Sequence, residues 1–409
     1  MRRGSNLPAV GTYNQTLVLD LIRRSPAGIS RIELAERTGL SAQTLSNVAR
    51  RLVAEGWVRE GTPVASGPGK PRTPLRLDPT ARCAVGIHLD PAVDTIVVVD
   101  LLGDVVAHIE REPRQSGTPS EIVADLADAV ETLLAEAGRT RASVLGIGVA
   151  APGPLDAEQG VLYAPPLLPE AWHGLALGRL LHEATSLATT VEKDVVAAMV
   201  GELWRDTAQE LQDSIVVYYG AGVGAGLAVD GTPIRGRTGN AGDVAHLVVE
   251  PGGPPCGCGQ HGCLGVAISP ERLLVDGGII APGAPVAAPS LRAHLRELAA
   301  RAVADDGRAR AAVEHAGANL ARAVVQINNL LDADVVVVGG PLWALLAPAA
   351  GPALARAVAA STETATVRGI RVLGSRLATD AAAVGAACLV LDAAMTARPT
   401  DLMIANVPG

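Results

Sequence analysis

The sequence predicts an α/β protein with an N-terminal winged helix-turn-helix followed by a two-lobed α/β body. Three observations predict this fold class. The first eighty residues contain helix-like segments with capping residues and a short alternating hairpin. The rest of the chain alternates apolar strand-like runs with helix-like runs. Residues 1–82 hold 13 Lys and Arg against 6 Asp and Glu, although the chain carries a net charge of −8, which indicates a basic module for a polyanion on an acidic body.

The composition narrows the class of protein. The chain has 409 residues, 48% hydrophobic and 19% charged, which is typical of globular domains and not of disorder. No uninterrupted apolar run of about 18 residues occurs, so a membrane span is not expected. The basic start "MRRGSNLPAVGTYNQ" has no apolar stretch behind it. We therefore expect a cytoplasmic protein without a membrane partner.

The N-terminal segment contains the signals of a helix-turn-helix. "YNQTLVLDLIRR" has helical apolar spacing, and "SRIELAERTG" begins with Ser30 and Glu33 at capping-box spacing and ends at Gly39. "SAQTLSNVARRLVAEGW" follows, with Ser41 as N-cap and Gly56 at its end. "WVRE" and "LRLDP" alternate as a two-stranded wing would, around the tip "GTPVASGPGKPRTP".

This module has side chains suited to DNA. The third helix presents short polar groups that can reach base edges in a major groove, with arginines behind them for phosphates. Basic residues of the wing can enter a minor groove or touch the backbone. The predicted DNA-contacting residues are Ser41, Ala42, Gln43, Thr44, Ser46, Asn47, Arg50, Arg51, Lys70 and Arg72. The alternative is an ordinary three-helix module with solvated arginines; the local positive charge favours DNA.

The body contains three glycine-bearing loops after apolar runs. They are "APGP" (151–154), "GAGVGAG" (220–226) and "GGP" (339–341). Glycines after a strand let backbone amides approach a phosphate. Ordinary turns of α/β proteins are also rich in glycine, so both interpretations stay open for each loop.

The stretch "PPCGCGQHGCLG" predicts a metal site. It contains Cys256, Cys258 and Cys263, and His246 precedes it in "GNAGDVAH". Three thiolates and one imidazole complete a closed tetrahedral zinc shell, which is typical of a structural metal. The spacing is not the C-x-x-C of a thioredoxin-like oxidoreductase. His261 is the competing fourth ligand; its place inside the tight loop favours His246.

With these motifs in hand, the chain resembles the ROK family of bacterial sugar kinases and sugar-responsive repressors. "GNAGDVAH" followed by "CGCGQHGCLG" is similar to the family's zinc element, and "GVGAGLAVDGTPIRG" to its second phosphate loop. "VEKDVVAAMVGE", "INNLLDADVVVVGG" and "ATDAAAVGAA" follow the family's order. The resemblance implies an actin/hexokinase-like body at 81–409 behind a winged domain at 1–80. Its first lobe covers about 81–195 with the helix 380–396, and its second lobe about 196–379.

The first phosphate loop departs from the resembling kinases. Their D-x-G-G-T motif falls on His88, Leu89, Asp90, Pro91 and Ala92. Asp90 adds negative charge where phosphates would lie, and proline removes a backbone donor. The second loop has an alanine, at position 221, where the kinases usually carry threonine. We therefore expect a cleft that does not phosphorylate sugars.

The resemblance also implies a sugar site. Its positions fall on Lys193, Asp194, Asp243, His246 and Gly265. Asp194 stands at the family's catalytic base and would here only bind a hydroxyl, so no catalytic residue is assigned. Lys193 replaces a neutral amide and Gly265 a glutamate. Lys193 either faces an anionic effector or forms an ion pair with a neighbouring carboxylate.

Together these features predict a DNA-binding repressor of sugar genes. It would bind a double-stranded operator as a homodimer or homotetramer and release it on binding a sugar or sugar derivative, with structural Zn²⁺. The effector is either an anionic or oligomeric sugar, or the pocket no longer senses one. The alternatives are an active sugar kinase with an attached DNA-binding domain, and a scaffold whose body binds a protein.

Overall fold

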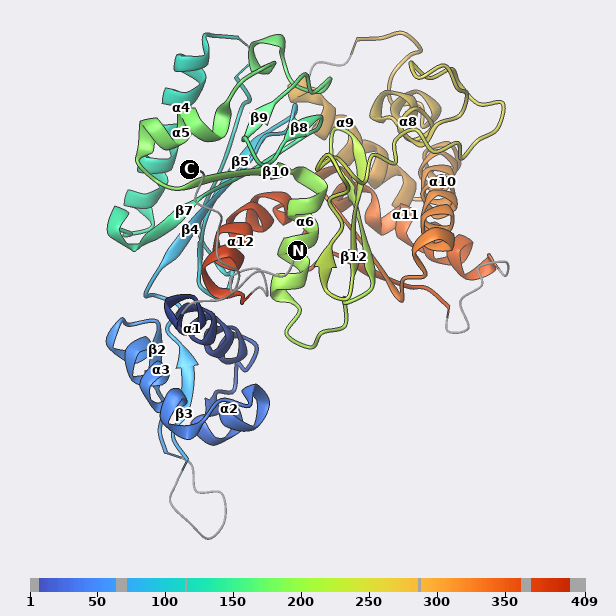
Figure 1. Ribbon diagram of the computed structural model, residues 1–409. Coiled ribbons are helices and arrows are strands. Elements are labelled where there is room, and N and C mark those ends of the chain that lie inside the picture. Colours follow the sequence, from blue (N-terminus) through green and yellow to red (C-terminus); the bar gives the residue numbers. More distant parts are fainter. Residues whose placement is uncertain (1–6, 64–71, 115, 286–287, 362–368, 398–409) are drawn as a thin grey trace.

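The computed structural model describes residues 7–63, 72–114, 116–285, 288–361 and 369–397. A small N-terminal domain projects from two larger α/β lobes, and two helices lie between the sheets of these lobes (Figure 1). The predicted α/β class with an N-terminal winged helix-turn-helix is confirmed. Position 70 of the wing lies outside the described residues.

The N-terminal domain packs three helices against a small antiparallel sheet. The sheet order is β1-β3-β2, so a short strand before the second helix joins the two predicted wing strands. The elements are α1 (Leu7–Arg23), β1 (Ile29–Ser30), α2 (Arg31–Thr38), α3 (Ala42–Ala54), β2 (Val58–Glu60) and β3 (Pro74–Leu77).

Local capping determines where the second and third helices begin. The Ser30 hydroxyl accepts a hydrogen bond from the Glu33 amide at 3.3 Å, and the Glu33 carboxylate accepts one from the Ser30 amide at 2.8 Å. Gly39 ends α2 with a φ of 70°, a conformation that glycine adopts without strain. Ser41 caps α3 by accepting from the Thr44 amide at 3.1 Å. The predicted capping residues are confirmed.

The first lobe is built on a mixed sheet of order β10-β7-β4-β5-β6. Helices α4 and α5 cover one face, and α12 packs on the other against β4, β5 and β7. The elements are β4 (Cys83–His88), β5 (Asp94–Asp100), β6 (Val105–Arg111), α4 (Pro119–Glu136), η1 (Arg141–Ser143), β7 (Val144–Ala151), β8 (Leu155–Asp156), β9 (Val161–Leu162), η2 (Glu170–Trp172), α5 (Leu177–Thr185), β10 (Thr189–Lys193) and α12 (Ala381–Met395).

The second lobe has a sheet of order β13-β12-β11-β14-β15. Helix α6 packs on one face and α11 on the other, with α9 and α10 beside α11. The elements are α6 (Asp194–Arg205), β11 (Ser214–Tyr219), β12 (Val223–Val229), β13 (Thr232–Pro233), α7 (Leu264–Ala267), α8 (Pro270–Asp276), α9 (Ala288–Val303), α10 (Gly307–Leu331), β14 (Val335–Gly339), α11 (Pro341–Ala360) and β15 (Arg371–Gly374).

The two lobes repeat one arrangement of strands. In each, an antiparallel hairpin (β4–β5 or β11–β12) is followed by two parallel strands on the other side of its first strand. The hairpin turns after β4 and β11 therefore occupy equivalent positions. Both turns line the cavity between the lobes, where they face each other.

Helices α6 and α12 form the layer between the two sheets (Figure 1). Residues from both helices and from β11 and β14 share one buried apolar cluster. Helix α11 has the length and hydropathy of a membrane span, but Leu342, Leu346 and Leu354 are buried in the core of the second lobe. We therefore interpret α11 as a core helix.

Candidate functional site

A cavity of about 490 Å³ lies between the two lobes. Its wall includes the ends of β10 and β11, the start of α6, and the segment 242–246. It brings together the four predicted sugar-binding residues Lys193, Asp194, Asp243 and His246. The volume lies in the range of pockets for small ligands.

Asp194 provides a half-buried carboxyl group at the start of α6. A carboxylate is favoured in the first turn of a helix, and Oδ1 of Asp194 accepts a hydrogen bond from the Val195 amide at 2.7 Å. Burial raises the pKa of Asp194, and the neighbouring His88 opposes this rise. The carboxylate oxygens of this group can accept a hydrogen bond from a sugar hydroxyl.

Lys193 lies beside Asp194 but bonds elsewhere. Its Nζ donates to the backbone carbonyl of Asn240 at 3.0 Å. The neighbouring Glu192 pairs with Arg235 at 2.6 Å. Among the described residues, no carboxylate lies within 4.0 Å of Lys193 Nζ. The ion pair with a neighbouring carboxylate, Glu192 or Asp194, is therefore not formed.

Gly265 brings α7 against the loop that carries Asp243 and His246. Its amide donates to the Ala245 carbonyl at 2.8 Å, and a Cβ on residue 265 would lie 3.3 Å from both the Cβ and the carbonyl oxygen of Ala245. Any side chain here must push the loop away. The cavity wall at Gly265 is therefore packed against Ala245.

The predicted metal ligands converge in space. Sγ of Cys256 lies 3.4 Å from Nδ1 of His246, and the Sγ atoms of Cys258 and Cys263 lie 3.6 Å apart. All four ligand atoms lie within 4.8 Å of one another. Since Zn–S bonds of about 2.3 Å place tetrahedral sulfurs roughly 3.8 Å apart, the donor set fits a closed zinc site. His261 instead bonds the Gly253 carbonyl through Nδ1 at 3.2 Å.

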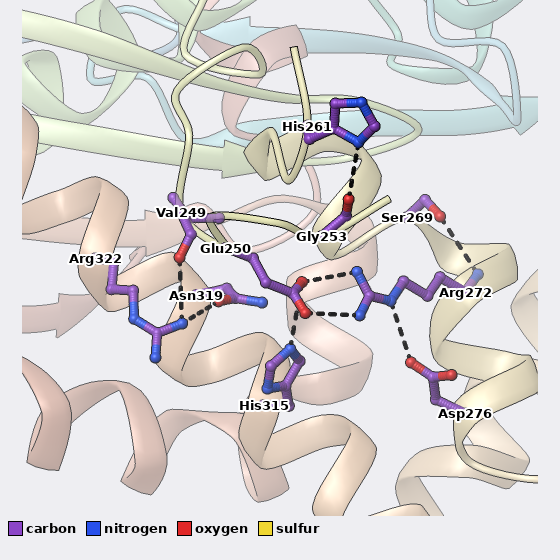
Figure 2. A network of polar contacts seen from close by, with 10 residues as sticks. All are labelled: Val249, Glu250, Gly253, His261, Ser269, Arg272, Asp276, His315, Asn319 and Arg322. Atoms are coloured by element: carbon purple, nitrogen blue, oxygen red, sulfur yellow. Dashed lines mark hydrogen bonds and ion pairs between the residues drawn. The ribbon is translucent and has the colours of Figure 1, made fainter. Parts of the chain in front are cut away.

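A polar network fixes the chain just before the cysteine loop (Figure 2). The two carboxylate oxygens of Glu250 bind the Arg272 guanidinium at 2.8 and 3.1 Å, and His315 approaches Glu250 at 3.6 Å. Arg272 also contacts Asp276 at 3.2 Å. The hydrogen bonds from Arg272 lower the pKa of Glu250. The Glu250 amide bonds the Gly262 carbonyl at 3.1 Å, so the network connects α8 and α10 to the metal loop.

Two first-lobe side chains, Asp90 and Leu167, contact the glycine loop after β11. Oδ2 of Asp90 accepts a hydrogen bond from the Ala221 amide at 3.4 Å, and Oδ1 accepts one from the Ala92 amide at 2.8 Å. Leu167 lies over Gly222, where a Cβ would come within 3.1 Å of Leu167 Cδ1. The chain's own carboxylate therefore faces the loop amide that a phosphate would use.

Further acidic groups lie near this turn. Burial raises the pKa of Asp94 to about 7, with Arg111 opposing the rise. Oδ2 of Asp94 is buried and has no hydrogen-bond partner among the described residues; it lies 3.8 Å from Nε of Arg111. Burial also raises the pKa of Tyr218, whose ring meets that of His88 edge-on at 5.7 Å. This end of the cleft thus contains buried polar groups with few partners.

The predicted DNA-contacting residues of α3 lie on its outer face. Leu45, Ala49 and Leu52 face the core of the N-terminal domain. Of the predicted residues, Thr44 and Ser46 are half-buried, and the exposed ones on α3 and its cap are Ser41, Ala42, Gln43, Asn47, Arg50 and Arg51. Arg51 pairs with Glu55 at 2.7 Å, whereas Arg72 is exposed on the wing.

The N-terminal domain joins the body through a contact that the sequence analysis missed. Arg23, near-fully buried at the end of α1, donates to the backbone carbonyl of Trp204 at 3.1 Å and lies 3.9 Å above its ring. Trp204 belongs to the last turn of α6, whose first residue is Asp194. One apolar cluster contains residues of α1, α3, β4 and α12. The two parts of the molecule therefore share a packed interface.

Two family models match the chain. The ROK family model matches residues 94–393, and the MarR family model matches residues 12–65. Among similar proteins, a "DNA-binding transcriptional dual regulator NagC" of Escherichia coli K12 is 27% identical over 342 residues, 82% of either chain. A "Xylose repressor" of Bacillus subtilis is 29% identical over 269 residues, 65% of this chain and 68% of the other.

Solved structures support the fold. A ROK family transcriptional regulator described as a homolog of the E. coli MLC protein superposes with a TM-score of 0.77 at 24% identity, covering 95% of this chain and 97% of the other. A ROK family glucokinase from Streptomyces griseus, in complex with glucose and AMPPNP, has a TM-score of 0.61 at 23% identity, covering 75% and 98%. The first match spans the N-terminal domain as well as the body.

Proposed function

The chain belongs to the ROK family, and on this premise we propose that it is a transcriptional repressor that binds operator DNA and releases it when a sugar occupies the cleft. The single observation that carries the proposal is the interface between the winged domain and the cleft. Helix α6 begins at Asp194 in the cavity wall and ends beside Arg23 of the winged domain. Repressors named for sugars are among its relatives.

The DNA would be bound by α3 and the wing. Gln43 and Asn47 occupy exposed positions one turn apart, and Nε2 of Gln43 lies 3.4 Å from Oδ1 of Asn47. Amide side chains of this kind form hydrogen bonds with the edge of adenine. Arg50 extends the same face toward a phosphate. A homodimer or homotetramer would present two such domains to a two-fold symmetric operator.

The cleft would bind sugar without transferring phosphate. Asp194 would hold a hydroxyl, and His246 would meet the sugar through the ring edge that the metal site leaves free. Asp90 places a carboxylate against the amide of the glycine loop, which opposes a nucleotide phosphate there. We therefore assign no kinase activity and no catalytic residue.

Structural zinc would be held by His246, Cys256, Cys258 and Cys263. It would fix the loop between β13 and α7 and the orientation of the His246 imidazole. We place the protein in the cytoplasm, where operator DNA and sugar are both accessible.

Sugar binding would reach the DNA domain by population shift. A ligand that binds the closed cleft more tightly shifts the population toward the closed arrangement of the lobes. Helices α6 and α12, which lie between the two sheets, would move as the lobes close. Because Arg23 is hydrogen-bonded and stacked on Trp204, movement of α6 is transmitted to α1. The winged domains of an oligomer then leave the spacing that the operator requires.

The test begins with capture of genomic fragments by the full-length protein, followed by titration of the enriched duplex by fluorescence anisotropy. We expect Gln43→Ala with Asn47→Ala to weaken binding by at least about tenfold, because each base contact contributes roughly 1–3 kcal/mol. Sugars that are transported or degraded by the products of genes next to the captured sites should weaken the binding of this duplex by the wild-type protein. Arg23→Gln should keep DNA binding and reduce the response to sugar.

Arg179→Gln, on the surface of the first lobe and paired only with Glu183 among the described residues, serves as control. It should behave as wild type in both titrations. Enrichment of no duplex above non-specific DNA would overturn the proposed function.

A further inference from the structure

Lys193 is an unusual residue in this chain. The sequence contains only two lysines, Lys70 in the wing and Lys193, while all other basic side chains besides histidine are arginines. Lys193 is the last residue of β10, only 7% exposed, and part of the cavity wall. An ammonium is a compact point charge with three rotatable donors.

The Lys193 ammonium has unused donors. Of its three N–H groups, one bonds the Asn240 carbonyl at 3.0 Å. The carboxylate of Glu192 is engaged by Arg235, and Oδ1 of Asp194 by the Val195 amide. Among the described residues no carboxylate approaches Lys193 Nζ within 4.0 Å. A buried cation with unfilled donors is costly unless an acceptor from solvent or ligand completes it.

The position of this ammonium is held from both lobes. The Asn240 side chain accepts from the Leu155 amide at 3.0 Å and donates to the Leu155 carbonyl at 2.9 Å. The first-lobe loop comes close because residue 153 is glycine: a Cβ there would lie 2.8 Å from Asn240 Oδ1 and 3.5 Å from Lys193 Cε. The donors of Lys193 are thus preorganised at the junction of the lobes.

Three carboxyl groups, those of Asp90, Asp194 and Asp243, line the same cavity as Lys193. Asp90 is bonded to the Ala92 and Ala221 amides at the glycine loop. Oδ1 of Asp194 accepts from the Val195 amide, and burial raises the pKa of this carboxyl while Lys193 opposes the rise. Asp243 is exposed and belongs to the segment 242–246. Lys193 is the cavity's only lysine or arginine among the described lining residues.

We propose that the effector is a sugar with an anionic substituent, a carboxylate or a phosphate ester, and that Lys193 binds this substituent. The inference rests on the proposed function and specifies its ligand class. A charge-assisted hydrogen bond from a preorganised ammonium is stronger than a neutral one, so the anionic sugar is preferred over its neutral parent. Lys193 of β10 already bonds the loop at Asn240, so the anionic substituent would bind at an existing contact between the lobes.

The test measures binding of matched sugars by isothermal titration calorimetry with the full-length protein. Glucose, galactose and N-acetylglucosamine are compared with glucuronate, galacturonate and the 6-phosphates of glucose and N-acetylglucosamine. We expect one anionic member to bind at least tenfold tighter than its neutral parent. In Lys193→Met this preference, expressed as the ratio of the two dissociation constants measured on the same variant, should fall below threefold. The carboxylate and phosphate arms distinguish the two anion types.

Three further measurements complete the test: a control variant, thermal melts and binding of inorganic phosphate. Arg179→Met removes a surface cation of the same lobe and should leave the tenfold preference unchanged, and thermal melts should show that Lys193→Met is folded. Inorganic phosphate alone should bind at least tenfold more weakly than the anionic sugar. Tightest binding by a neutral sugar, no binding by any member, or a preference retained in Lys193→Met overturns the inference. Release of operator by a neutral sugar would leave the proposed function intact.

Discussion

The two ends of the cleft contain very different chemistry. At the metal end, His246 and three cysteines turn their donor atoms toward one point, and the cavity wall beside them is lined by groups that can bond a sugar. At the glycine-loop end, Asp90 and Leu167 of the first lobe cover the loop of the second. The difference teaches that one cavity of this architecture can have convergent cysteine and histidine donors at one end and, at the other, a glycine loop contacted by the chain's own carboxylate.

The repeated strand order explains how the filled end arises. The turns after β4 and β11 are equivalent in the two lobes and face each other. The second turn keeps the glycines at positions 220 and 222, whereas the first contains Asp90 and Pro91. Proline lacks an N–H, and the aspartate carboxylate accepts from the opposite turn. The turn after β4 therefore contacts the turn after β11 through the Asp90 carboxylate.

The largest effect is expected at the metal end. Replacing Cys256 and Cys258 together by serine should abolish bound zinc, measured per chain by mass spectrometry. Loss of a structural metal is among the few changes that cost more than about 4 kcal/mol, so the free energy of unfolding in urea should fall by that amount. The response of operator binding to sugar should be lost with it.

His246→Gln and His261→Gln form a matched pair for the fourth ligand. The first should lose zinc, and the second should retain it because His261 bonds the Gly253 carbonyl outside the quartet. Full zinc content and full stability in the double serine variant would refute the assignment of this end of the cleft.

A smaller effect is expected at Asp94, on the filled side. Its carboxyl has a pKa of about 7 in the folded protein against an ordinary 3.8, because it is buried. Between about pH 4 and 7 the unfolded chain loses this proton while the folded chain keeps it, so folding stability falls as pH rises and is level above 7. Asp94→Asn should therefore be more stable at pH 8, by on the order of 2 kcal/mol, and equal to wild type near pH 4.

Urea titrations at pH 4, 6 and 8 measure this difference. Asp156→Asn serves as the control: this residue ends β8, and its carboxylate accepts from the Gln159 amide and the Tyr163 hydroxyl. A pH-independent difference between Asp94→Asn and wild type would show that this carboxyl is ionised throughout.

The smallest effect concerns the glycine loop itself. Wild type should gain no thermal stability from pyrophosphate or Mg–ATP, since Asp90 occupies the Ala221 amide. Asp90→Gly removes that carboxylate and should gain a weak stabilisation by pyrophosphate, about 0.4 kcal/mol when the ligand concentration equals Kd. Differential scanning fluorimetry measures both. If Mg–ATP stabilised the wild-type protein as much as it stabilises Asp90→Gly, the glycine-loop end of the cleft would still admit a nucleotide.

Much of the fold could be predicted because its signals are local. Ser30, Gly39 and Ser41 act within one helical turn, so their capping roles follow from spacing and backbone geometry alone. The metal quartet was also predictable, because three of its four ligands lie within eight residues and soft thiolates have few other roles at that spacing. The order of α/β segments indicated two lobes in the same way.

The sequence by itself thus determined the fold class, the helix caps and the composition of the metal quartet. Only the tertiary structure decided that Asp90 reaches Ala221, that Lys193 bonds Asn240 and not a carboxylate, and that Arg23 stacks on Trp204. These partners are separated by 131, 47 and 181 residues. Such contacts depend on how sheets and helices pack, because a local pattern specifies the chemistry of a side chain but not the group that packing brings against it.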